Sequence, residues 1–246
     1  MSKRVNVDQL LKDIRKAAES AGFRIESYGE AFGYSLIVGT RTAETSTEQT
    51  KHIYISAGIH GDEPAPPQAL LELIRSDALP RSNSYVICPC MNPAGMVANT
   101  RENPDGIDLN RDYTDFVSNE IETHHRWVEA HLTKLDLALH LHEDWEAKGF
   151  YFYELNFDGH ASRAEAILEA AAKYLPIELA SRIDGHRARG GVIRPPELPD
   201  VPEGRPEAIY FQQRYGLLNY TLETPSGLEM EQRIAAMQAA TLAAMS

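Results

Sequence analysis

The stretch that decides the fold is IYISAGIHGDEP, residues 53–64. Its first half is rich in β-branched and aromatic residues and predicts a buried strand over residues 52–57. Pro64 then opens a helix, because the first turn of a helix tolerates a residue that lacks an N–H. Between the strand and the helix, His60 and Glu63 are spaced i, i+3 and can point into one crevice. An imidazole and a carboxylate placed in this way commonly supply two protein ligands of a catalytic zinc ion.

A second histidine-bearing segment, residues 135–142, offers the third ligand. It reads LDLALHLH and is apolar enough for a strand that is buried on both faces. His140 and His142 face the same side of this strand, because side chains alternate along it with a period of two. A single histidine in an apolar strand is more often a core residue than a ligand. His142 lies closer to the carboxyl end of the strand, and together with His60 and Glu63 it is therefore expected to complete a metal site.

Strands and helices alternate along the rest of the chain, and no internal repeat divides it. The alternation predicts one α/β domain over residues 1–246 with a largely parallel or mixed sheet. Ligands of such sheets bind beyond the carboxyl ends of the strands. His60, His142 and Glu223 all lie at such ends, so we expect them to share one crevice. The predicted helices cover residues 6–21, 66–74, 118–132, 161–174 and 229–245, and the predicted strands cover residues 34–39, 52–57, 84–90, 135–142, 150–155 and 217–223.

Composition and charge exclude several classes of function. The 246 residues are 43% hydrophobic with a mean hydropathy of -0.38, which is typical of a globular protein. Lys and Arg number 24 against 36 Asp and Glu, and the resulting formal charge of -12 opposes binding to nucleic acid or to an anionic membrane. No apolar run approaches the roughly 18 residues that span a bilayer, and the first ten residues lack the apolar segment of a signal peptide. Cys88 and Cys90 cannot complete a thiolate metal site alone, so we expect two small buried residues in a cytoplasmic protein.

The polar segment RENPDGIDLNR, residues 101–111, carries the next functional signal. Its composition alone predicts a Pro-Asp-Gly turn inside a longer loop over residues 92–112. Arg101 and Arg111 keep their charge at any physiological pH and suit carbonyl or carboxylate oxygens. Beside a metal they would serve as an electrophile and as a substrate clamp.

Glu223 follows the apolar predicted strand over residues 217–222. An isolated carboxylate at a strand end is usually exposed to water. Here the apolar residues before it and the Thr-Pro pair after it favour a carboxylate that is held at the crevice. Glu143 and Asp144, next to His142, compete with it as a base or as an extra ligand and rank lower.

These motifs, taken in order from about residue 53 to residue 225, resemble those of the M14 zinc carboxypeptidases. They are His60-x-x-Glu63, Arg101-x-Asn103-x-x-Gly106-x-Asp108-Leu109-Asn110-Arg111, a histidine that ends a later strand, and Glu223-Thr224-Pro225. The combination is specific, although each piece alone is not. The chain is also close in size to the small bacterial cell-wall-peptide amidases of the same family. The resemblance implies a three-layer α/β/α fold with a mixed, mostly parallel sheet and one zinc ion.

The resemblance also implies a role for each matching residue around the metal. His60, Glu63 and His142 would hold zinc, which lowers the pKa of a bound water towards about 7. Glu223 would be the general base that takes a proton from this water. Asp108 would accept the second N–H of His60 and so fix the tautomer of that ring.

The substrate side of the resemblance is less complete. It implies that Arg101 polarises the scissile carbonyl and stabilises the oxyanion, and that Asn110 and Arg111 hold the terminal carboxylate of the substrate. Archetypal members also carry a mobile tyrosine in the loop before the catalytic glutamate, where this chain reads DVPEGRP, residues 200–206. Tyr210 is the nearest aromatic hydroxyl, and the sequence does not place it in that role.

The Gly- and Pro-rich segment of residues 185–206 is too long for a simple connection and is predicted to be a lid or a pocket wall. Its arginines either lie on a solvated loop or line a pocket for an acidic residue of the substrate. These arginines are Arg187, Arg189, Arg194 and Arg205.

Three functions remain open at this point. The first is a zinc-dependent, carboxypeptidase-like hydrolase that cleaves an amide bond next to a free carboxylate in small peptides, among them acidic or cell-wall peptides. The second is an N-acyl amino acid deacylase similar to aspartoacylase and succinylglutamate desuccinylase. The third is a non-catalytic binding protein on the same scaffold. The complete segment from Arg101 to Arg111 and the Glu223-Thr224-Pro225 motif favour the first function, while the oligomeric state and the identity of the metal stay open.

Overall fold

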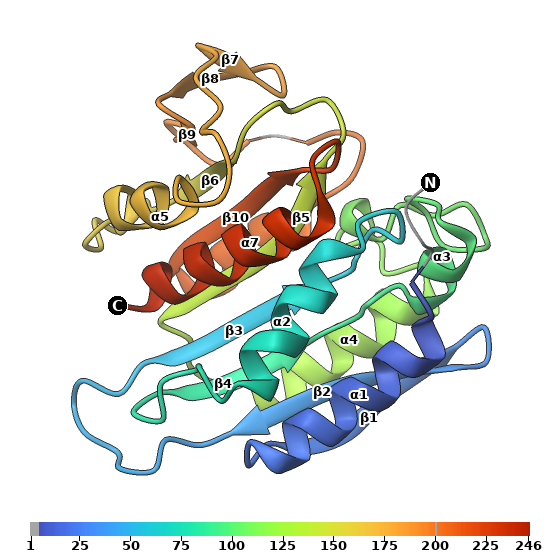
Figure 1. Cartoon of the computed structure of the whole chain (residues 1–246). Helices are drawn as coiled ribbons and strands as arrows, with labels where there is room; N and C mark the ends of the chain where they lie inside the picture. Colours follow the sequence, from blue (N-terminus) through green and yellow to red (C-terminus); the bar gives the residue numbers. More distant parts are fainter. Residues whose placement is uncertain (1–4, 200) are drawn as a thin grey trace.

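The computed structural model describes residues 5–199 and 201–246, and its centre is a ten-stranded mixed sheet (Figure 1). The strand order across the sheet is β1-β2-β4-β3-β5-β10-β6-β9-β8-β7. The strands are β1 (Arg24–Ala31), β2 (Tyr34–Arg41), β3 (His52–Ala57), β4 (Ser84–Cys88), β5 (Leu137–Asp144), β6 (Tyr151–Leu155), β7 (Arg182–Ile183), β8 (His186–Arg189), β9 (Val192–Ile193) and β10 (Leu218–Pro225). The helices are α1 (Val7–Ser20), α2 (Ala65–Arg75), α3 (Pro93–Ala98), the 3-10 helix η1 (Leu109–Arg111), α4 (Asn119–His131), α5 (Ala164–Ala171), α6 (Glu207–Tyr215) and α7 (Met230–Met245).

The pairing confirms a mixed sheet with a parallel centre. Strands β4, β3, β5 and β10 are parallel to their neighbours in this group. The strands outside this group pair mainly in antiparallel fashion, as in β1 with β2 and β6 with β10. The carboxyl ends of β3, β5 and β10 therefore meet at one edge of the sheet, which is where α/β sheets bind their ligands.

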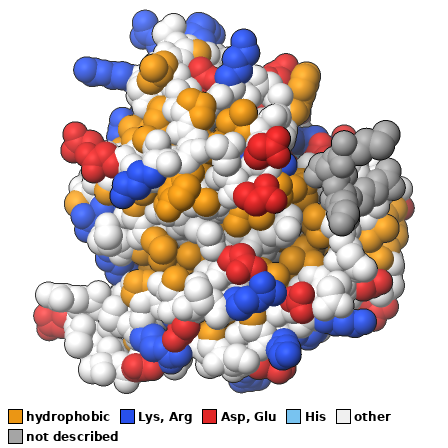
Figure 2. Space-filling model, in the orientation of Figure 1, with side chains coloured by type: hydrophobic (Ala, Val, Ile, Leu, Met, Phe, Trp, Pro, Cys, Tyr) orange, Lys and Arg blue, Asp and Glu red, His pale blue; other side chains and the backbone are white. Residues whose placement is uncertain are grey.

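Helices cover both faces of the sheet, and the side-chain alternation of β5 shows which face carries the site. Leu137, Leu139 and Leu141 join the larger apolar cluster under α1, α2, α5 and α7. Ala138 belongs to the second cluster, under α4 and α6, and His140 points the same way because it is two residues further on. Figure 1 shows α1, α2 and α7 in front of the sheet, and Figure 2 shows acidic and basic side chains interspersed over that side. The histidines therefore point to the opposite face.

Several elements differ from the predicted pattern, each for a physical reason. Strand β1 was not predicted, because it is a half-exposed edge strand with the polar sequence RIESYGEA, and edge strands carry charges to prevent further pairing. Helix α6 was not predicted either, since its nine residues are rich in aromatics, which are weak helix formers. The expected loop over residues 92–112 contains the short helices α3 and η1. The segment of residues 185–206 contains β8 and β9.

The two cysteines are the small buried residues that the sequence predicts. Cys88 and Cys90 are both buried, unpaired thiols near the end of β4. Burial raises the pKa of the Cys88 thiol above its usual range, so it stays protonated and unreactive at neutral pH. In residues 5–199 and 201–246, no helix combines the length and the apolar character needed to cross a membrane.

Candidate active site

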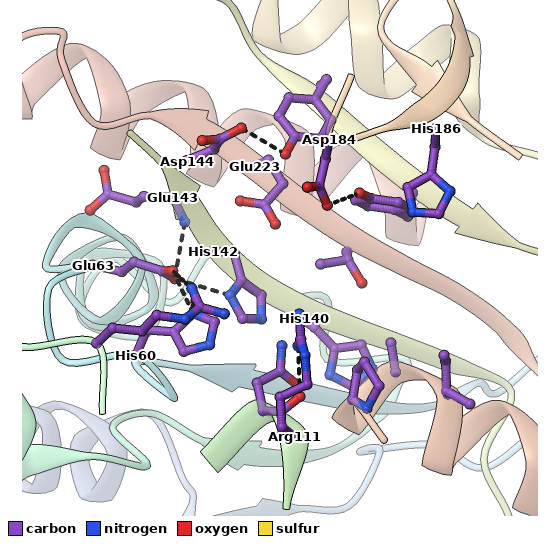
Figure 3. Close-up of a pocket in the computed structure, with 18 of the residues that line it drawn as sticks. His60, Glu63, Arg111, His140, His142, Glu143, Asp144, Asp184, His186 and Glu223 are labelled. Carbon is purple, nitrogen blue, oxygen red and sulfur yellow. Dashed lines mark hydrogen bonds and ion pairs between the residues drawn. The ribbon is translucent and has the colours of Figure 1, made fainter. Parts of the chain in front are cut away.

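A cavity of about 610 Å³ opens at the carboxyl ends of β3, β5 and β10 (Figure 3). Almost all of the predicted site residues line it, although they come from segments that lie far apart in the sequence. Asp108 is the exception, because it lies behind His60 rather than on the cavity wall. The predicted residues that line the cavity are His60, Glu63, Arg101, Asn110, Arg111, His142 and Glu223.

Three predicted ligands converge on one point inside this cavity. His60, Glu63 and His142 each offer a ligand atom, and these atoms all lie within 4.8 Å of one another. Nδ1 of His60 lies 2.5 Å from Oε1 of Glu63, and Nδ1 of His142 lies 3.0 Å from Oε2 of the same carboxylate. All three residues are buried. Two imidazoles and a carboxylate at this spacing form a donor set that can hold a metal ion.

Contacts behind the ligands support this assignment of donor atoms. Nε2 of His60 donates to Oδ1 of Asp108 at 3.2 Å, which leaves Nδ1 free to bind a cation. Burial opposes a charge on His60, but the carboxylates of Glu63 and Asp108 raise the pKa of this ring to about 9. Burial also opposes the charge on Glu63, but His60 and His142 hold the pKa of that carboxyl below its usual range. The cluster therefore stabilises positive charge, as a cation site must.

A glycine allows His60 to reach this position. A Cβ atom on Gly61 would lie 2.1 Å from the carbonyl carbon of Gly95, well inside the contact limit. The backbone N–H of Gly61 donates to the carbonyl oxygen of Arg101 at 3.3 Å. Only a glycine permits this close approach of two chain segments. The approach brings the loop that carries Arg101 next to the predicted ligands.

Arg101 lies beside the cation site, where the resemblance predicts an electrophile. Its Nε donates to Oδ2 of Asp108 at 2.9 Å, and its terminal nitrogen lies 3.3 Å from Nδ1 of His60 and 4.0 Å from Oε1 of Glu63. The side chain is 39% exposed, so one edge of the guanidinium stays open to the cavity. A substrate carbonyl at the cation site would therefore lie within reach of this charge.

Asn110 and Arg111 occupy another part of the cavity wall. Oδ1 of Asn110 accepts the backbone N–H of Glu207 at 2.9 Å, so the amide N–H groups of Asn110 point away from Glu207. Arg111 donates to the backbone carbonyl of Asn110 at 2.9 Å. Two amide donors and a guanidinium side by side are well suited to a carboxylate.

Glu223 lies next to His142, on the neighbouring parallel strand. The two residues are register partners between β10 and β5, and Tyr151 of β6 is the partner of Glu223 on its other side. Burial, followed by the charges of Glu63 and Asp144, raises the pKa of the Glu223 carboxyl well above its usual range. A carboxylate with a raised pKa beside a cation site is a competent proton acceptor.

The two competing carboxylates have other partners. Glu143 forms a buried ion pair with Arg233 at 2.5 Å and accepts the backbone N–H of Ala65 at 2.8 Å. Asp144 accepts the hydroxyl of Tyr151 at 2.9 Å. No hydrogen bond to the Glu223 carboxylate is found among the described residues, which leaves it the best-placed base.

Two tyrosines on the cavity wall were missed at the sequence level. Tyr151 and Tyr153 of β6 both line the cavity, and the hydroxyl of Tyr153 donates to Oδ2 of Asp184 at 2.5 Å. Their spacing of two along a strand places them on one face, and this signal could have found them. Tyr210 instead bonds His125 at 2.9 Å. In the window of residues 200–206, Asp200 lies outside the described residues.

The arginines of the Gly- and Pro-rich segment do not form a pocket for an acidic side chain. Arg194 pairs with Glu154 at 3.1 Å, and Arg205 bonds Gln213 at 2.9 Å. Arg187 and Arg189 are exposed. Among the described residues, the arginines on the cavity wall are Arg101 and Arg111. The arginines of the Gly- and Pro-rich segment therefore fit the prediction of a solvated loop.

A buried polar network lies beneath the cavity, and it was not predicted. Glu207, at the start of α6, accepts hydrogen bonds from Tyr54 and Ser56 at 2.6 Å each and from Nδ1 of His140 at 2.7 Å. The Tyr54 hydroxyl also lies 2.9 Å from Nε2 of His124. Since Tyr54 donates its one proton to Glu207, it must accept from Nε2–H of His124. Burial opposes the charge on Glu207, but the neighbouring histidines and hydroxyls bring its pKa down to about 2.

Replacement of His124 by Gln is expected to reduce the loss of stability in acid. Burial lowers the pKa of His124 to about 4, below the value of about 6.5 in an unfolded chain. The unfolded chain therefore binds more protons between these values, so the free energy of unfolding falls as the pH falls through this window, by about 2 kcal/mol at pH 5. Urea unfolding of the metal-free wild type and variant at about pH 7.5 and pH 5 measures the difference. An equal loss in both proteins would contradict the assignment.

Comparison with known proteins gives a consistent family and fold. A family model described as the succinylglutamate desuccinylase/aspartoacylase catalytic domain matches residues 49–246. A candidate metallopeptidase from Shewanella amazonensis SB2B superposes with a TM-score of 0.82 at 22% identity, covering 97% of this chain and 91% of that one. A metallo-carboxypeptidase from Burkholderia cenocepacia superposes with a TM-score of 0.69 at 18% identity, covering 96% of this chain and 67% of that one. A search of curated proteins found no match.

Proposed function

This chain belongs to the succinylglutamate desuccinylase/aspartoacylase catalytic-domain family, which is M14-like in fold, and we propose that it is a zinc-dependent amide hydrolase. Its substrate would be a small peptide that is cleaved next to a free carboxylate. The observation that carries the proposal is the convergence of His60, Glu63 and His142, with ligand atoms within 4.8 Å, beside the carboxylate of Glu223. The family match supports a hydrolase, and the cation site in the cavity supports a metal-dependent one.

His60, Glu63 and His142 would hold the metal ion. When bound, zinc supplies a water molecule that ionises near neutral pH and a Lewis acid for the substrate carbonyl. Asp108 keeps Nε2 of His60 protonated and therefore keeps Nδ1 available. The ring needs no reorganisation at the moment of metal binding, because its orientation is already set by this hydrogen bond.

Glu223 and Arg101 would perform the proton transfer and the charge stabilisation. Glu223 accepts a proton from the attacking water and then returns it to the leaving nitrogen. Its raised pKa suits both steps, because a proton transfers most efficiently when donor and acceptor are closely matched. Arg101 is held by Asp108 with part of its guanidinium open to the cavity. A preorganised cation of this kind stabilises the negative charge that develops on the carbonyl oxygen.

The charge of the cavity wall favours a peptide over a succinylated substrate. Carboxylates on the wall outnumber the two arginines, Arg101 and Arg111, by a wide margin. A negatively charged acyl group such as succinyl would be repelled by this excess, whereas the free amino group of a dipeptide would be attracted. The carboxylates that carry this excess are Asp62, Asp144, Glu146, Asp184 and Glu203, because Glu63 is a proposed metal ligand, Glu143 is paired with Arg233 and burial favours the protonated form of Glu223.

An N-acyl amino acid deacylase is the second candidate, because the matching family model is named after two such enzymes. Both candidates break an amide bond next to an amino acid carboxylate, so Arg111 would act in either. They differ in the acyl group. A panel of unblocked dipeptides, N-acetyl amino acids and N-succinyl amino acids, assayed with the zinc-loaded protein, separates them.

The expected result is hydrolysis of dipeptides with a kcat/KM at least about tenfold above that of N-succinyl amino acids, a preference that corresponds to about 1.4 kcal/mol. Arg111→Ala is expected to raise KM for every substrate with a free carboxylate by about 10- to 100-fold. Preference for N-succinyl amino acids would refute the peptide assignment, and absence of turnover with all three groups would refute the enzyme.

A further inference from the structure

The cavity has chemically different walls on the two sides of the cation site. Arg111, His142 and Asp184 all line it, and Figure 3 shows Arg111 and Asp184 on opposite sides of His142. A substrate whose carboxylate lies at Arg111, with its scissile carbonyl at the cation site, extends its acyl part towards Asp184. The side chains around Asp184 therefore bear on which acyl parts the cavity accepts.

A tyrosine of the central sheet holds Asp184 in place. Asp184 and Gly185 form the two-residue turn between β7 and β8, with φ angles of 47° and 73°, which is the backbone geometry of a tight hairpin turn. Oδ2 of Asp184 accepts the hydroxyl of Tyr153 at 2.5 Å. Tyr153 itself is fixed in β6, where it pairs with Thr221 of β10. One oxygen of the carboxylate is thus bound to the sheet, and Oδ1 stays available to a ligand.

Aromatic rings flank this carboxylate along the cavity wall. The Tyr153 ring packs edge-on against Tyr151 and His186, with centroid distances of 6.0 Å and 5.7 Å, and all three residues line the cavity. The faces of tyrosine rings attract cations, and a carboxylate forms its strongest hydrogen bonds with charged donors. A carboxylate beside tyrosine rings is therefore a suitable site for an ammonium group.

The basic residues of the same hairpin leave the charge of Asp184 available. Arg182 donates to the carbonyl oxygen of Gly185 at 2.7 Å, and Arg187 and Arg189 are exposed. No ion pair of Asp184 is found among the described residues. Since Asp184 is also exposed at the mouth of the cavity, a positively charged group of a ligand can reach it.

We propose that Asp184, positioned by Tyr153, binds a primary ammonium group on the acyl side of the cleaved bond. An N–H of the ammonium group donates to Oδ1, while the hydroxyl of Tyr153 holds Oδ2. The inference rests on the proposed function for the position of the cleaved bond, whereas the binding of an ammonium group requires neither zinc nor turnover.

Two sources of the ammonium group fit the spacing of the sheet. Strand β6 lies two strands away from β5, which separates their backbones by about 10 Å. The α-amino group of a dipeptide stays next to the cleaved bond. The α-amino group of a tripeptide and the side-chain amine of a lysine before the cleaved bond both extend further, and they present the same chemistry to Asp184.

Binding is tested by NMR of the zinc-free protein, with alaninamide as the probe and N-acetylalaninamide as its uncharged counterpart. The backbone amide signal of Gly185, which follows Asp184, reports on the site. We expect alaninamide, but not the acetylated probe, to shift this signal in the wild type and not in Asp184→Asn. An unmoved signal in the wild type, or an equal shift in the variant, would overturn the proposal.

Kinetics of the zinc-loaded protein identify the source of the ammonium group. The substrates are trialanine and N-acetyl-lysyl-alanine, with N-acetyl-trialanine and N-acetyl-alanyl-alanine as their uncharged references. Asp184→Asn is expected to raise KM about 3- to 10-fold for a substrate that uses the site, as for one partly exposed charge pair, with kcat within about twofold. A selective rise for trialanine identifies the α-amino group, and one for the lysyl substrate identifies the side-chain amine. The same change for charged and uncharged substrates, or no change, would overturn the proposal.

The positioning role of Tyr153 has its own test. Tyr153→Phe keeps the ring and removes the hydroxyl that holds Asp184. We expect KM to rise about 2- to 5-fold for the same charged substrate as in Asp184→Asn, and to stay unchanged for its acetylated reference. An unchanged KM for the charged substrate would overturn the positioning role.

A matched control lies elsewhere on the molecule. Glu129 is also a carboxylate that accepts a tyrosine hydroxyl, from Tyr210 at 3.0 Å, and it is not among the residues that line the cavity. Glu129→Gln should leave KM and the response of Gly185 to alaninamide unchanged. A wild type that shows this response yet hydrolyses no amide would contradict the proposed function alone, whereas an active wild type without the response would contradict this inference alone.

Discussion

Glu223→Gln is expected to lower kcat by about 10²- to 10⁴-fold, the usual contribution of a general acid–base residue. The substitution keeps the size of the side chain and removes its ability to accept a proton. Glu223 is the register partner of His142 and carries no hydrogen bond among the described residues, so the change should leave the metal ligands in place. Initial rates on a dipeptide, together with metal content, measure both effects.

A matched control for this substitution is Glu146→Gln, which also removes a carboxylate from the cavity wall. Glu146 is exposed and follows β5, and it is not among the described residues that offer a ligand atom to the cation site. We expect its kcat to stay within about twofold of the wild type, as is normal for surface substitutions. Retention of full activity in Glu223→Gln would exclude this residue as the base. Asp144, which also lines the cavity, would then be the next candidate for the base.

His142→Ala is expected to abolish both metal binding and turnover. The substitution removes one of three ligands, and loss of even a supporting residue costs about 10- to 100-fold in metal affinity. A metal ion present at about 1,000 times its dissociation constant stabilises the folded chain by about 4 kcal/mol. Zinc should therefore raise the melting temperature of the wild type and leave that of the variant almost unchanged. Calorimetric titration with zinc and thermal unfolding provide independent measurements.

The control for the metal experiment is His52→Gln, since His52 begins β3 and the predicted metal ligands lie at or beyond the carboxyl ends of the strands. This variant should bind zinc with the affinity of the wild type and show the same rise in melting temperature. Chelation of the wild-type protein should reproduce the loss of activity, and added zinc should restore it. An unaltered zinc affinity in His142→Ala would show that His60, Glu63 and His142 do not share one ion.

The fold was predictable wherever residues follow a strong local period. The apolar run that ends in His142 requires a strand buried on both faces, and the structure has it as β5 over Leu137–Asp144. The segment of residues 53–64 was equally clear, because an apolar strand, a polar turn and a proline follow one another. Strand β1 and helix α6 were not predictable in this way, because one is polar along an edge and the other is short and aromatic.

The candidate site was predictable to the extent that its residues form motifs. His60, Glu63 and the Arg101 to Arg111 segment follow spacings that a resemblance can detect. Glu207 and His140 follow no such spacing, since 67 residues separate the two partners of their hydrogen bond. The pocket suggested for an acidic side chain was not found, because Arg194 bonds Glu154, Arg205 bonds Gln213, and the other two arginines of that segment are exposed.

The amino-acid sequence by itself determined the alternation of strands and helices, the donor types of the cation site and the order of its motifs, because these depend on residues that are close in the chain. Only the tertiary structure decided which carboxylates and tyrosines face the cavity. It also decided that His142 faces the cation site, whereas His140 pairs with Glu207. These outcomes depend on the pairing of β5 with β10 and of β10 with β6. Strand pairing joins residues about 80 apart in the chain, for instance His142 and Glu223, and no local pattern records that contact.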